Sequence, residues 1–242
     1  MKQKITTLLG LSFLSSLGAF GATSFDANVT PGVIFGSGNA NGNFTVYQDS
    51  VSGLEIGLRA KVPYTGVINN MGDGHYKIGG GEVWNFDWSV NTDYNDTSGK
   101  VLSSYTYRLS LDANPGVGVT NFLTFDPITS DGSNYFDHSL GTNSTTSSTD
   151  VIAGNAGDYQ TDLGNYNVAQ NSWRYQFFNS TSPLDTFIPG APGEYEIKFE
   201  VSKDNFTSVL GSQSIFVDVP EPSMAFGGIL CLAGLGIRRR SR

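Results

Sequence analysis

The chain has 242 residues, with 14 Lys and Arg against 22 Asp and Glu, which gives a formal net charge of −8. This length suits one all-β domain or at most two small domains. Charged residues make up only 15% of the chain and glycine contributes 30 residues, which argues against a charge-rich helical or coiled-coil protein. The 12% of aromatic residues argues against wholesale disorder.

The N-terminal stretch has the three parts of a secretory signal peptide. Two lysines lie near its start, an apolar run follows over 8–20, and small residues lead up to Gly21. The alternative is a buried N-terminal helix, but the small residues and the lack of acidic residues in this stretch suit export better. We therefore expect a signal peptide over 1–21, cut after Gly21 or, alternatively, after Ala22 or Ser24.

The body of the chain, over 22–219, contains repeated runs in which apolar and polar residues alternate. In one run Leu54 and Ile56 face one way while Glu55 and Arg59 face the other. Such alternation with a period of two is typical of a half-buried strand. Runs of this kind cover 54–62, 84–90, 105–111, 173–177, 195–201 and 215–219.

Clean alternation favours antiparallel sheets whose apolar faces meet. The predicted fold is therefore all-β, an antiparallel β-sandwich of jelly-roll or lectin-like type, flanked by the signal peptide and a short C-terminal transmembrane helix. The polar stretch over 130–170 is predicted to be a long surface loop with a short helix. The glycine-rich segment over 36–42 is predicted to connect two strands, since no helix follows it to form a phosphate site.

The C-terminal part, over 220–242, combines three elements in order. Pro220, Glu221 and Pro222 come first, and an apolar stretch over 224–237 follows. Four arginines come last, namely Arg238, Arg239, Arg240 and Arg242. As a helix the fourteen apolar residues rise only about 21 Å, against about 30 Å for the hydrocarbon core of a bilayer. Snorkelling and local thinning can still hold such a helix transiently, with its arginines as a cytoplasmic anchor.

This order of elements resembles the PEP-CTERM sorting signal of Gram-negative bacteria. The resemblance implies that a membrane-embedded sorting protease, exosortase, cuts near the motif and passes the protein towards the outer surface. It also implies a link to exopolysaccharide and biofilm production. Pro220, Glu221 and Pro222 would be the recognition element, and two prolines hold such a segment extended, as a protease cleft requires. Residues 29–42 and 88–91 are similar to other PEP-CTERM ectodomains of unknown activity, which adds no catalytic residue.

Cysteine usage and charge limit which covalent links and which partners the body can have. Cys231 is the only cysteine and lies in the apolar tail, so the body can form no disulfide. Without the two N-terminal lysines, the four C-terminal arginines and Glu221, the body keeps 8 basic and 21 acidic residues, a net charge of −13. Such a surface excludes nucleic acid as a partner and is compatible with divalent cations.

Candidate metal ligands are sparse. His75 and His138 are isolated in polar segments, where solvated or turn-bonded side chains are expected, and no paired zinc-ligand spacing occurs. Oxygen ligands at alternate positions, which suit calcium, occur at Asn91, Asp93, Asn95 and Asp96. The stretch is not an EF-hand loop, because its sixth position is Asp96 and no glutamate stands at the twelfth. We expect no cofactor, with calcium as the alternative.

Catalytic candidates are equally weak. Glu194, Glu196 and Glu200 share the outward face of one predicted strand, beside Lys198, and could in principle serve a glycoside hydrolase. We interpret them as an exposed ladder of mixed charge, because such ladders are more often solvated than catalytic. No nucleophile elbow of the G-x-S-x-G type occurs in the chain. The expected protein is not an enzyme.

These expectations combine into one functional hypothesis. The protein is expected to pass the secretion machinery, to be anchored transiently in the membrane, and then to reach the outer surface or the extracellular matrix. There it would act as a structural or adhesive component, with extracellular polysaccharide as a partner. The alternative is a carbohydrate-binding module that stacks sugars on exposed aromatic rings such as Tyr47, Tyr64 or Tyr159. A polysaccharide-cleaving enzyme ranks third.

Overall fold

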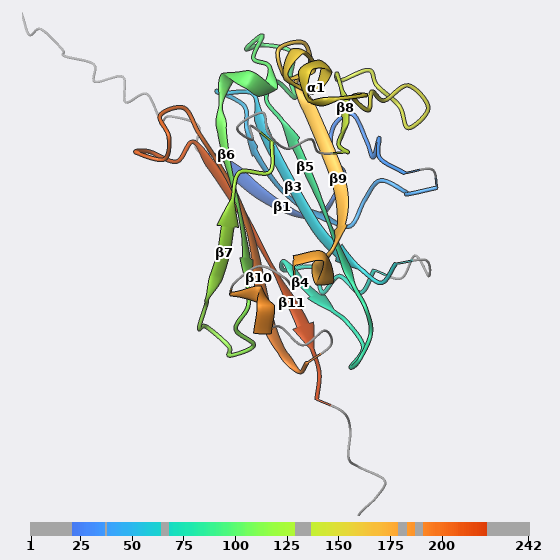
Figure 1. Ribbon diagram of the computed structural model, residues 1–242, viewed down its shortest axis with the longest axis vertical. Coiled ribbons are helices and arrows are strands. Elements are labelled where there is room, and N and C mark those ends of the chain that lie inside the picture. Colours follow the sequence, from blue (N-terminus) through green and yellow to red (C-terminus); the bar gives the residue numbers. More distant parts are fainter. Residues whose placement is uncertain are drawn as a thin grey trace, which may run out of the picture.

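The computed structural model describes residues 21–36, 38–63, 68–128, 137–178, 183–186 and 191–221. These residues form two β-sheets, three short 3₁₀ turns and one α-helix (Figure 1). The six-stranded sheet contains, in spatial order, β1 (Ala22–Ala27), β2 (Phe44–Asp49), β3 (Leu54–Lys61), β5 (Asn85–Asn91), β9 (Val168–Arg174) and β8 (Ser139–Gly141). The five-stranded sheet contains β4 (His75–Lys77), β11 (Gly211–Val219), β10 (Gly193–Ser202), β6 (Thr106–Asp112) and β7 (Phe122–Phe125).

Strand pairing is antiparallel throughout the described sheets except between β11 and β4, which run parallel. The prediction of an all-β body with mainly antiparallel sheets is therefore confirmed. Five of the six predicted runs coincide with strands, but the run over 173–177 overlaps only the last two residues of one and was placed wrongly. The strand β9 ends at Arg174, and Tyr175–Phe178 continues as a 3₁₀ turn.

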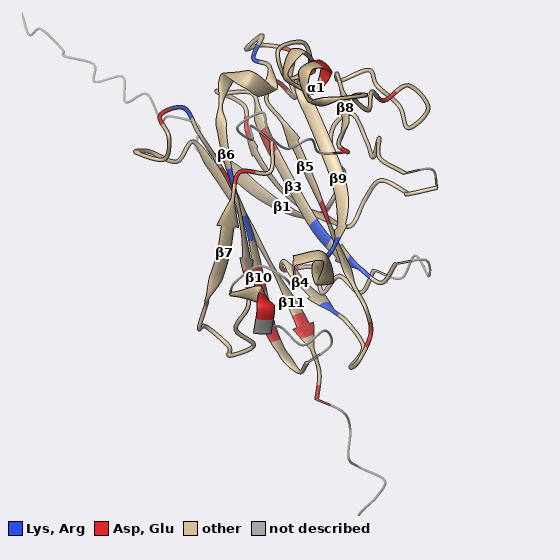
Figure 2. Cartoon of the chain, in the orientation of Figure 1, with Lys and Arg blue, Asp and Glu red and all other residues tan. Residues whose placement is uncertain are grey.

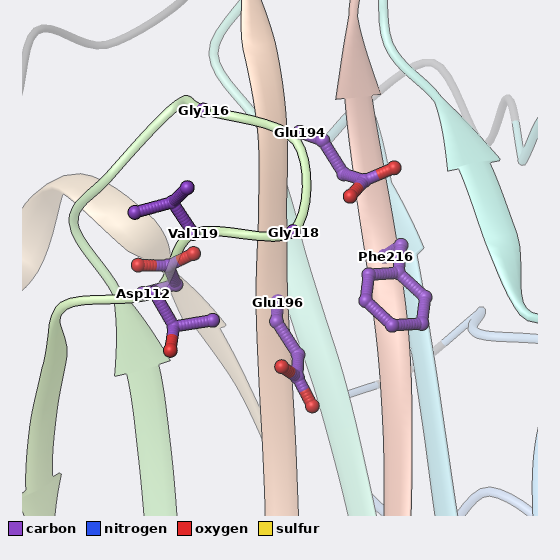
Figure 3. Close-up of a pocket in the computed structure, with 8 residues that line it drawn as sticks. Asp112, Gly116, Gly118, Val119, Glu194, Glu196 and Phe216 are labelled. Carbon is purple, nitrogen blue, oxygen red and sulfur yellow. The ribbon is translucent and has the colours of Figure 1, made fainter.

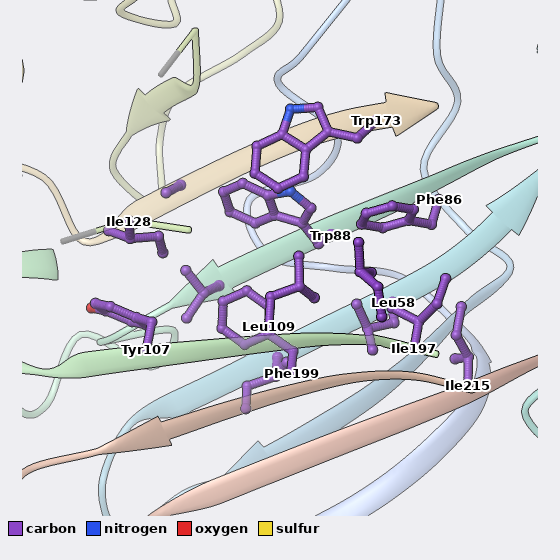
Figure 4. Close-up of a cluster of buried hydrophobic side chains, with 14 of the residues drawn as sticks. Leu58, Phe86, Trp88, Tyr107, Leu109, Ile128, Trp173, Ile197, Phe199 and Ile215 are labelled. Atoms are coloured by element: carbon purple, nitrogen blue, oxygen red, sulfur yellow. The ribbon is translucent and has the colours of Figure 1, made fainter. Parts of the chain in front are cut away.

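One hydrophobic core lies between the two sheets, and both contribute to it. Trp88 of β5 and Phe199 of β10 meet across it, with their ring centroids 5.8 Å apart. Trp173 of β9 packs against the edge of Trp88 at 5.4 Å, as Figure 4 shows. Each large apolar side chain buried in this way contributes about 1.5–3 kcal/mol to stability. This core buries the apolar strand faces that the alternation of residues predicted.

The outward face of β3 is buried, which corrects the expectation that it faces solvent. Glu55, Gly57, Arg59 and Lys61 are all buried, because the segment of residues 28–36 and 38–43 lies across them. That segment packs a second, smaller cluster of apolar side chains on this face, formed by Val29, Val33, Phe35, Phe44 and Val46. Gly57 is needed there, since a Cβ atom at this position would lie 2.4 Å from a methyl carbon of Val29.

Polar side chains beneath this segment bond its backbone. The Glu55 carboxylate accepts hydrogen bonds from the Thr30 amide at 2.7 Å and from the Gln48 side chain at 2.6 Å. Gln170 of β9 accepts from the Ile34 amide at 2.8 Å, so a second strand also binds the segment. Buried backbone groups need such partners, which explains polar residues at buried positions of the sheet.

A buried ion cluster lies on the same face. Asp87 of β5 accepts from Arg59 at 2.7 Å and from Lys61 at 2.9 Å, and all three residues are buried. The Arg59 guanidinium also donates to the backbone oxygens of Ala40 and Gly42 at 2.9 and 2.8 Å. One carboxylate thus offsets two buried cations, whose other partners, such as the carbonyls of Ala40 and Gly42, carry no charge.

The stretch over 130–170 is not simply a surface loop. It contains the strand β8 and the helix α1 (Ala156–Leu163), the latter as predicted, and β9 begins within it. Leu140 and Leu163 are buried in the shared core. Among the described residues, no helix is long and apolar enough to cross a membrane. Several predicted features lie outside the described residues. They are residues 1–20 of the predicted signal peptide, Pro222, the apolar stretch over 224–237 and the four arginines.

Candidate functional site

Acidic residues gather at one end of β10 and β11 in the five-stranded sheet (Figure 2). Half-buried positions alternate with buried ones along β11 and the first part of β10, and the half-buried ones form the outer face of this sheet. Glu194 pairs with Asp218, and Glu196 with Phe216, in the register of these two strands. His75 of β4 stands opposite Phe216. Because alternate residues of a strand face the same side, these five side chains share the outer face.

Three of them form what we call the outer-face cluster: His75, Glu194 and Asp218. One nitrogen or oxygen atom from each lies within 4.8 Å of the others, and all three residues are half-buried. His75 Nδ1 lies 3.1 Å from the Asp218 carboxylate. The imidazole stacks on the Phe216 ring, with centroids 4.9 Å apart and planes 21° apart, which fixes its orientation.

Next to this cluster lies a pocket of about 250 Å³, which we call the loop pocket. It is lined by Asp112, Gly116, Gly118, Val119, Thr120, Glu194, Glu196 and Phe216. Figure 3 shows Glu196 and Phe216 on neighbouring strands, beside the loop that carries Gly116, Gly118 and Val119. Glu194 belongs to both features and links them.

The wall of the loop pocket is held by specific hydrogen bonds. The Asp112 carboxylate accepts from the amides of Asn114 at 2.9 Å and Asn121 at 2.7 Å, which closes the loop between β6 and β7. The Glu194 amide donates to the Pro115 carbonyl at 3.1 Å, so this loop is also tied to β10. These bonds give the pocket a preformed shape.

The glutamates of β10 do not form one exposed ladder, which corrects the prediction. Glu200 is buried, and it accepts from Arg108 at 2.8 Å and from Lys198 at 2.9 Å. Burial acts to raise the pKa of its carboxyl, but the bonds from Arg108 and Lys198 outweigh burial and hold the pKa below its ordinary value. Glu200 therefore has a structural role, while Glu194 and Glu196 remain half-buried at the pocket.

The four residues named as ligands in the alternative of a calcium site lie in and after the end of β5. Asp93 accepts from the amides of Ser98 at 2.8 Å and Gly99 at 2.9 Å, which closes a turn. Burial acts to raise the pKa of the Asp93 carboxyl, but the bonds from Ser98, Gly99 and Thr97 lower it overall. Side-chain oxygens of the other three also accept hydrogen bonds from the protein, at Asn91, Asn95 and Asp96. This is the bonding of an ordinary Asn/Asp turn, and calcium binding there stays a prediction.

His138 is not solvated, contrary to the prediction. It is fully buried, with the rings of Trp88, Tyr159 and Trp173 around it. Its Nε2 lies 2.6 Å from the Pro127 carbonyl, and its Nδ1 lies 3.2 Å from the Asn171 amide nitrogen. Burial lowers the pKa of His138 to about 4, so the ring is neutral at pH 7.

Two of the three aromatic residues predicted as sugar platforms, Tyr47 and Tyr159, make contacts within the protein. Tyr159 is buried and its hydroxyl donates to the Ile128 carbonyl at 3.1 Å, so its prediction as an exposed platform is wrong. Tyr47 is half-buried, with its hydroxyl on the Leu210 carbonyl at 3.3 Å, and Tyr64 lies outside the described residues. Phe216, which the sequence reasoning missed, is the ring that lines the loop pocket.

Two residues of the predicted sorting motif lie within the described residues. Pro220 and Glu221 are exposed and follow β11 directly, which ends at Val219.

Comparisons with protein-family models, with curated proteins and with solved structures find no match to this chain.

Proposed function

We propose that this protein is exported, handed to exosortase through its C-terminal signal, and placed on the outer surface or in the extracellular matrix. There it serves as a structural or adhesive component linked to exopolysaccharide, without enzymatic activity of its own. The observation that carries the proposal is the order of Pro220, Glu221 and Pro222, the apolar stretch and the arginine cluster. The body between the signals is a β-sandwich in this proposal, of jelly-roll or lectin-like type.

The position of the signals relative to the fold supports this proposal. The strand β1 begins at Ala22, directly after the expected cut at Gly21. The strand β11 ends at Val219, and the exposed Pro220 and Glu221 stand where a protease can reach them. Both cuts would therefore leave every described strand in place.

Substitution of the motif tests the proposal in the producing cells. We expect the triple variant Pro220→Ala, Glu221→Ala, Pro222→Ala to remain in the membrane fraction with its tail, as the unaltered protein does in cells without the sorting protease. The neighbouring Ser223→Ala variant is the matched control and should be processed normally. Immunoblots of membrane and medium fractions measure both, and normal release of the triple variant would contradict the proposal.

Carbohydrate binding is a second candidate, which the loop pocket favours. An aromatic ring beside fixed carboxylates is the arrangement that sugar sites use, and Phe216 lies beside Glu194 and Glu196. In a glycan array, Phe216→Ala should abolish binding while Phe177→Ala, which removes an exposed ring far from the pocket in the chain, should keep it. Equal binding by both variants would exclude this pocket as the sugar site.

A further inference from the structure

Three strands bring one metal-binding side chain each to the outer-face cluster. His75 comes from β4, Glu194 from β10 and Asp218 from β11. We propose that these three side chains bind a divalent transition-metal ion, with zinc as the best fit. This inference goes beyond the proposed function and does not depend on how the protein is sorted.

The set of donors selects the class of metal. One imidazole nitrogen and two carboxylate oxygens suit zinc and similar first-row ions, which accept mixed nitrogen and oxygen ligands. Calcium instead takes six to eight oxygen ligands, which three side chains with one imidazole do not supply. Three protein ligands also leave one coordination position of a tetrahedral ion open to solvent.

The separation between two of the ligand atoms already fits a shared ion. His75 Nδ1 and the nearer Asp218 oxygen are 3.1 Å apart. Two ligand atoms bound to one tetrahedral zinc ion lie about 3.3 Å apart, given bonds of about 2.0 Å. The Glu194 oxygen lies within 4.8 Å of both, and rotation of its half-exposed side chain can close that gap.

The ligands are held by strands rather than by flexible loops. The amide of Phe216 donates to the Gly74 carbonyl at 2.9 Å, which ties β11 to the start of β4. The Phe216 ring then supports the imidazole of His75 from one side. Glu194 and Asp218 are direct partners in the ladder of β10 and β11. Ligands placed in this way need little reorganisation to bind an ion.

Local charge also favours a cation. Two carboxylates meet here, and Glu196 adds a third on the same face of β10. Within the described ranges, neither a hydrogen bond nor an ion pair occupies the Glu194 carboxylate. Lys77 stands opposite Asp218 in the register of β4 and β11, but among the described residues it forms no ion pair, so Asp218 is not neutralised by it. A divalent ion would offset the repulsion between neighbouring carboxylates.

Calorimetric titration of zinc chloride into the full-length protein, purified without an affinity tag, tests the proposal. We expect one zinc ion per chain, with His75→Ala, Glu194→Gln and Asp218→Asn each weakening binding at least about tenfold. The matched control is Glu196→Gln, which removes the next carboxylate on the same face and should bind zinc as the unaltered protein does. The ligand residues are half-buried on an outer face, so these variants should unfold at the same temperature without metal.

Cobalt provides a second measurement on the unaltered fold. Co²⁺ bound to the cluster should give a visible absorption band that zinc displaces and that His75→Ala removes. Absence of zinc binding by the unaltered protein would overturn the proposal. Zinc binding that survives His75→Ala would also overturn it, because the ion would then be held elsewhere. Calcium binding that outcompetes zinc would overturn the transition-metal assignment.

Discussion

His138 shows how strongly the environment of one side chain can differ from its sequence context. Asp137 and Ser139 flank it, yet its imidazole is enclosed by aromatic rings and bonded to the Pro127 carbonyl. Burial lowers its pKa to about 4, from an ordinary value of 6.5. The unfolded chain therefore binds a proton on His138 between pH 6.5 and 4 that the folded chain does not bind.

This difference predicts a loss of stability in acid. As the pH falls from about 6.5 to about 4, the free energy of unfolding should decrease by roughly 3 kcal/mol on account of His138 alone.

The variant His138→Gln should be less stable at pH 7 but should lose less unfolding free energy between these pH values. Urea unfolding of both proteins at pH 7 and pH 4 measures the difference. The raised pKa of Glu55, due mainly to burial, acts in the opposite direction and is shared by both proteins. Equal losses in the two proteins would contradict the assignment.

The buried Asp87 carries a larger energetic consequence. Its carboxylate contacts both Arg59 and Lys61, so Asp87→Ala leaves two buried cations without their partner. We expect the free energy of unfolding to fall by about 3–5 kcal/mol. The control is Lys198→Ala, which breaks a partly exposed ion pair with Glu200 and should cost less than about 1 kcal/mol. Denaturant unfolding measures the loss of unfolding free energy in both variants. Similar losses in the two variants would contradict the burial of the Asp87 cluster.

At the scale of elements, the helix α1 depends on Asn155, the residue just before its first turn. The Asn155 side chain accepts from the amides of Gly157 at 2.9 Å and Asp158 at 3.0 Å, which caps the helix. Asn155→Ala should lower the unfolding free energy by about 1 kcal/mol, whereas Asn155→Ser keeps a capping oxygen and should lose less. Thermal unfolding measures both variants. A larger loss for the serine variant would contradict the capping role.

The strand β11 predicts where the chain can be shortened. It lies between β10 and β4, so both of its edges are paired, and it ends at Val219. A chain that ends at Val219 should unfold within a few degrees of the full-length protein. A chain that ends at Ser214 loses half of this interior strand and should not unfold cooperatively. Circular dichroism melting curves decide this, and a cooperative transition of the shorter chain would contradict the pairing.

The sequence predicts elements well where one face of a strand meets the core. The alternation of Leu54, Ile56 and Leu58 locates β3, and their burial follows from it. The alternation does not predict that the opposite face is buried, because the burial of Glu55 and Arg59 depends on a covering segment that local periodicity cannot reveal. Short or exposed edge strands such as β1 and β4 are also not predicted, since they bury too few alternating residues to give a pattern.

The candidate site could be predicted only in part for a related reason. The positions of Glu194 and Asp218 on outward faces follow from their own strands. Their meeting with His75 does not, because 143 residues separate His75 from Asp218 and the parallel pairing of β4 with β11 brings them together. The pairing of distant strands, rather than any sequence motif, creates the cluster.

At the scale of the whole molecule, two sheets around one core form a body that needs no disulfide. Its net charge of −13, counted between the expected cuts, suits an extracellular acidic protein. Because β1 and β11 lie just inside the expected cuts, removal of both proposed signals would leave every described strand in place. The central claim is therefore about processing at the two ends.

Mass spectrometry of both termini, in cells with and without the sorting protease, tests this claim most directly. We predict an N-terminus at Ala22 in both strains. We also predict a C-terminus within 220–223 only where the protease is intact. A protein that still ends at Arg242 in both strains would contradict the account, and with it the proposed place of this protein in the extracellular matrix.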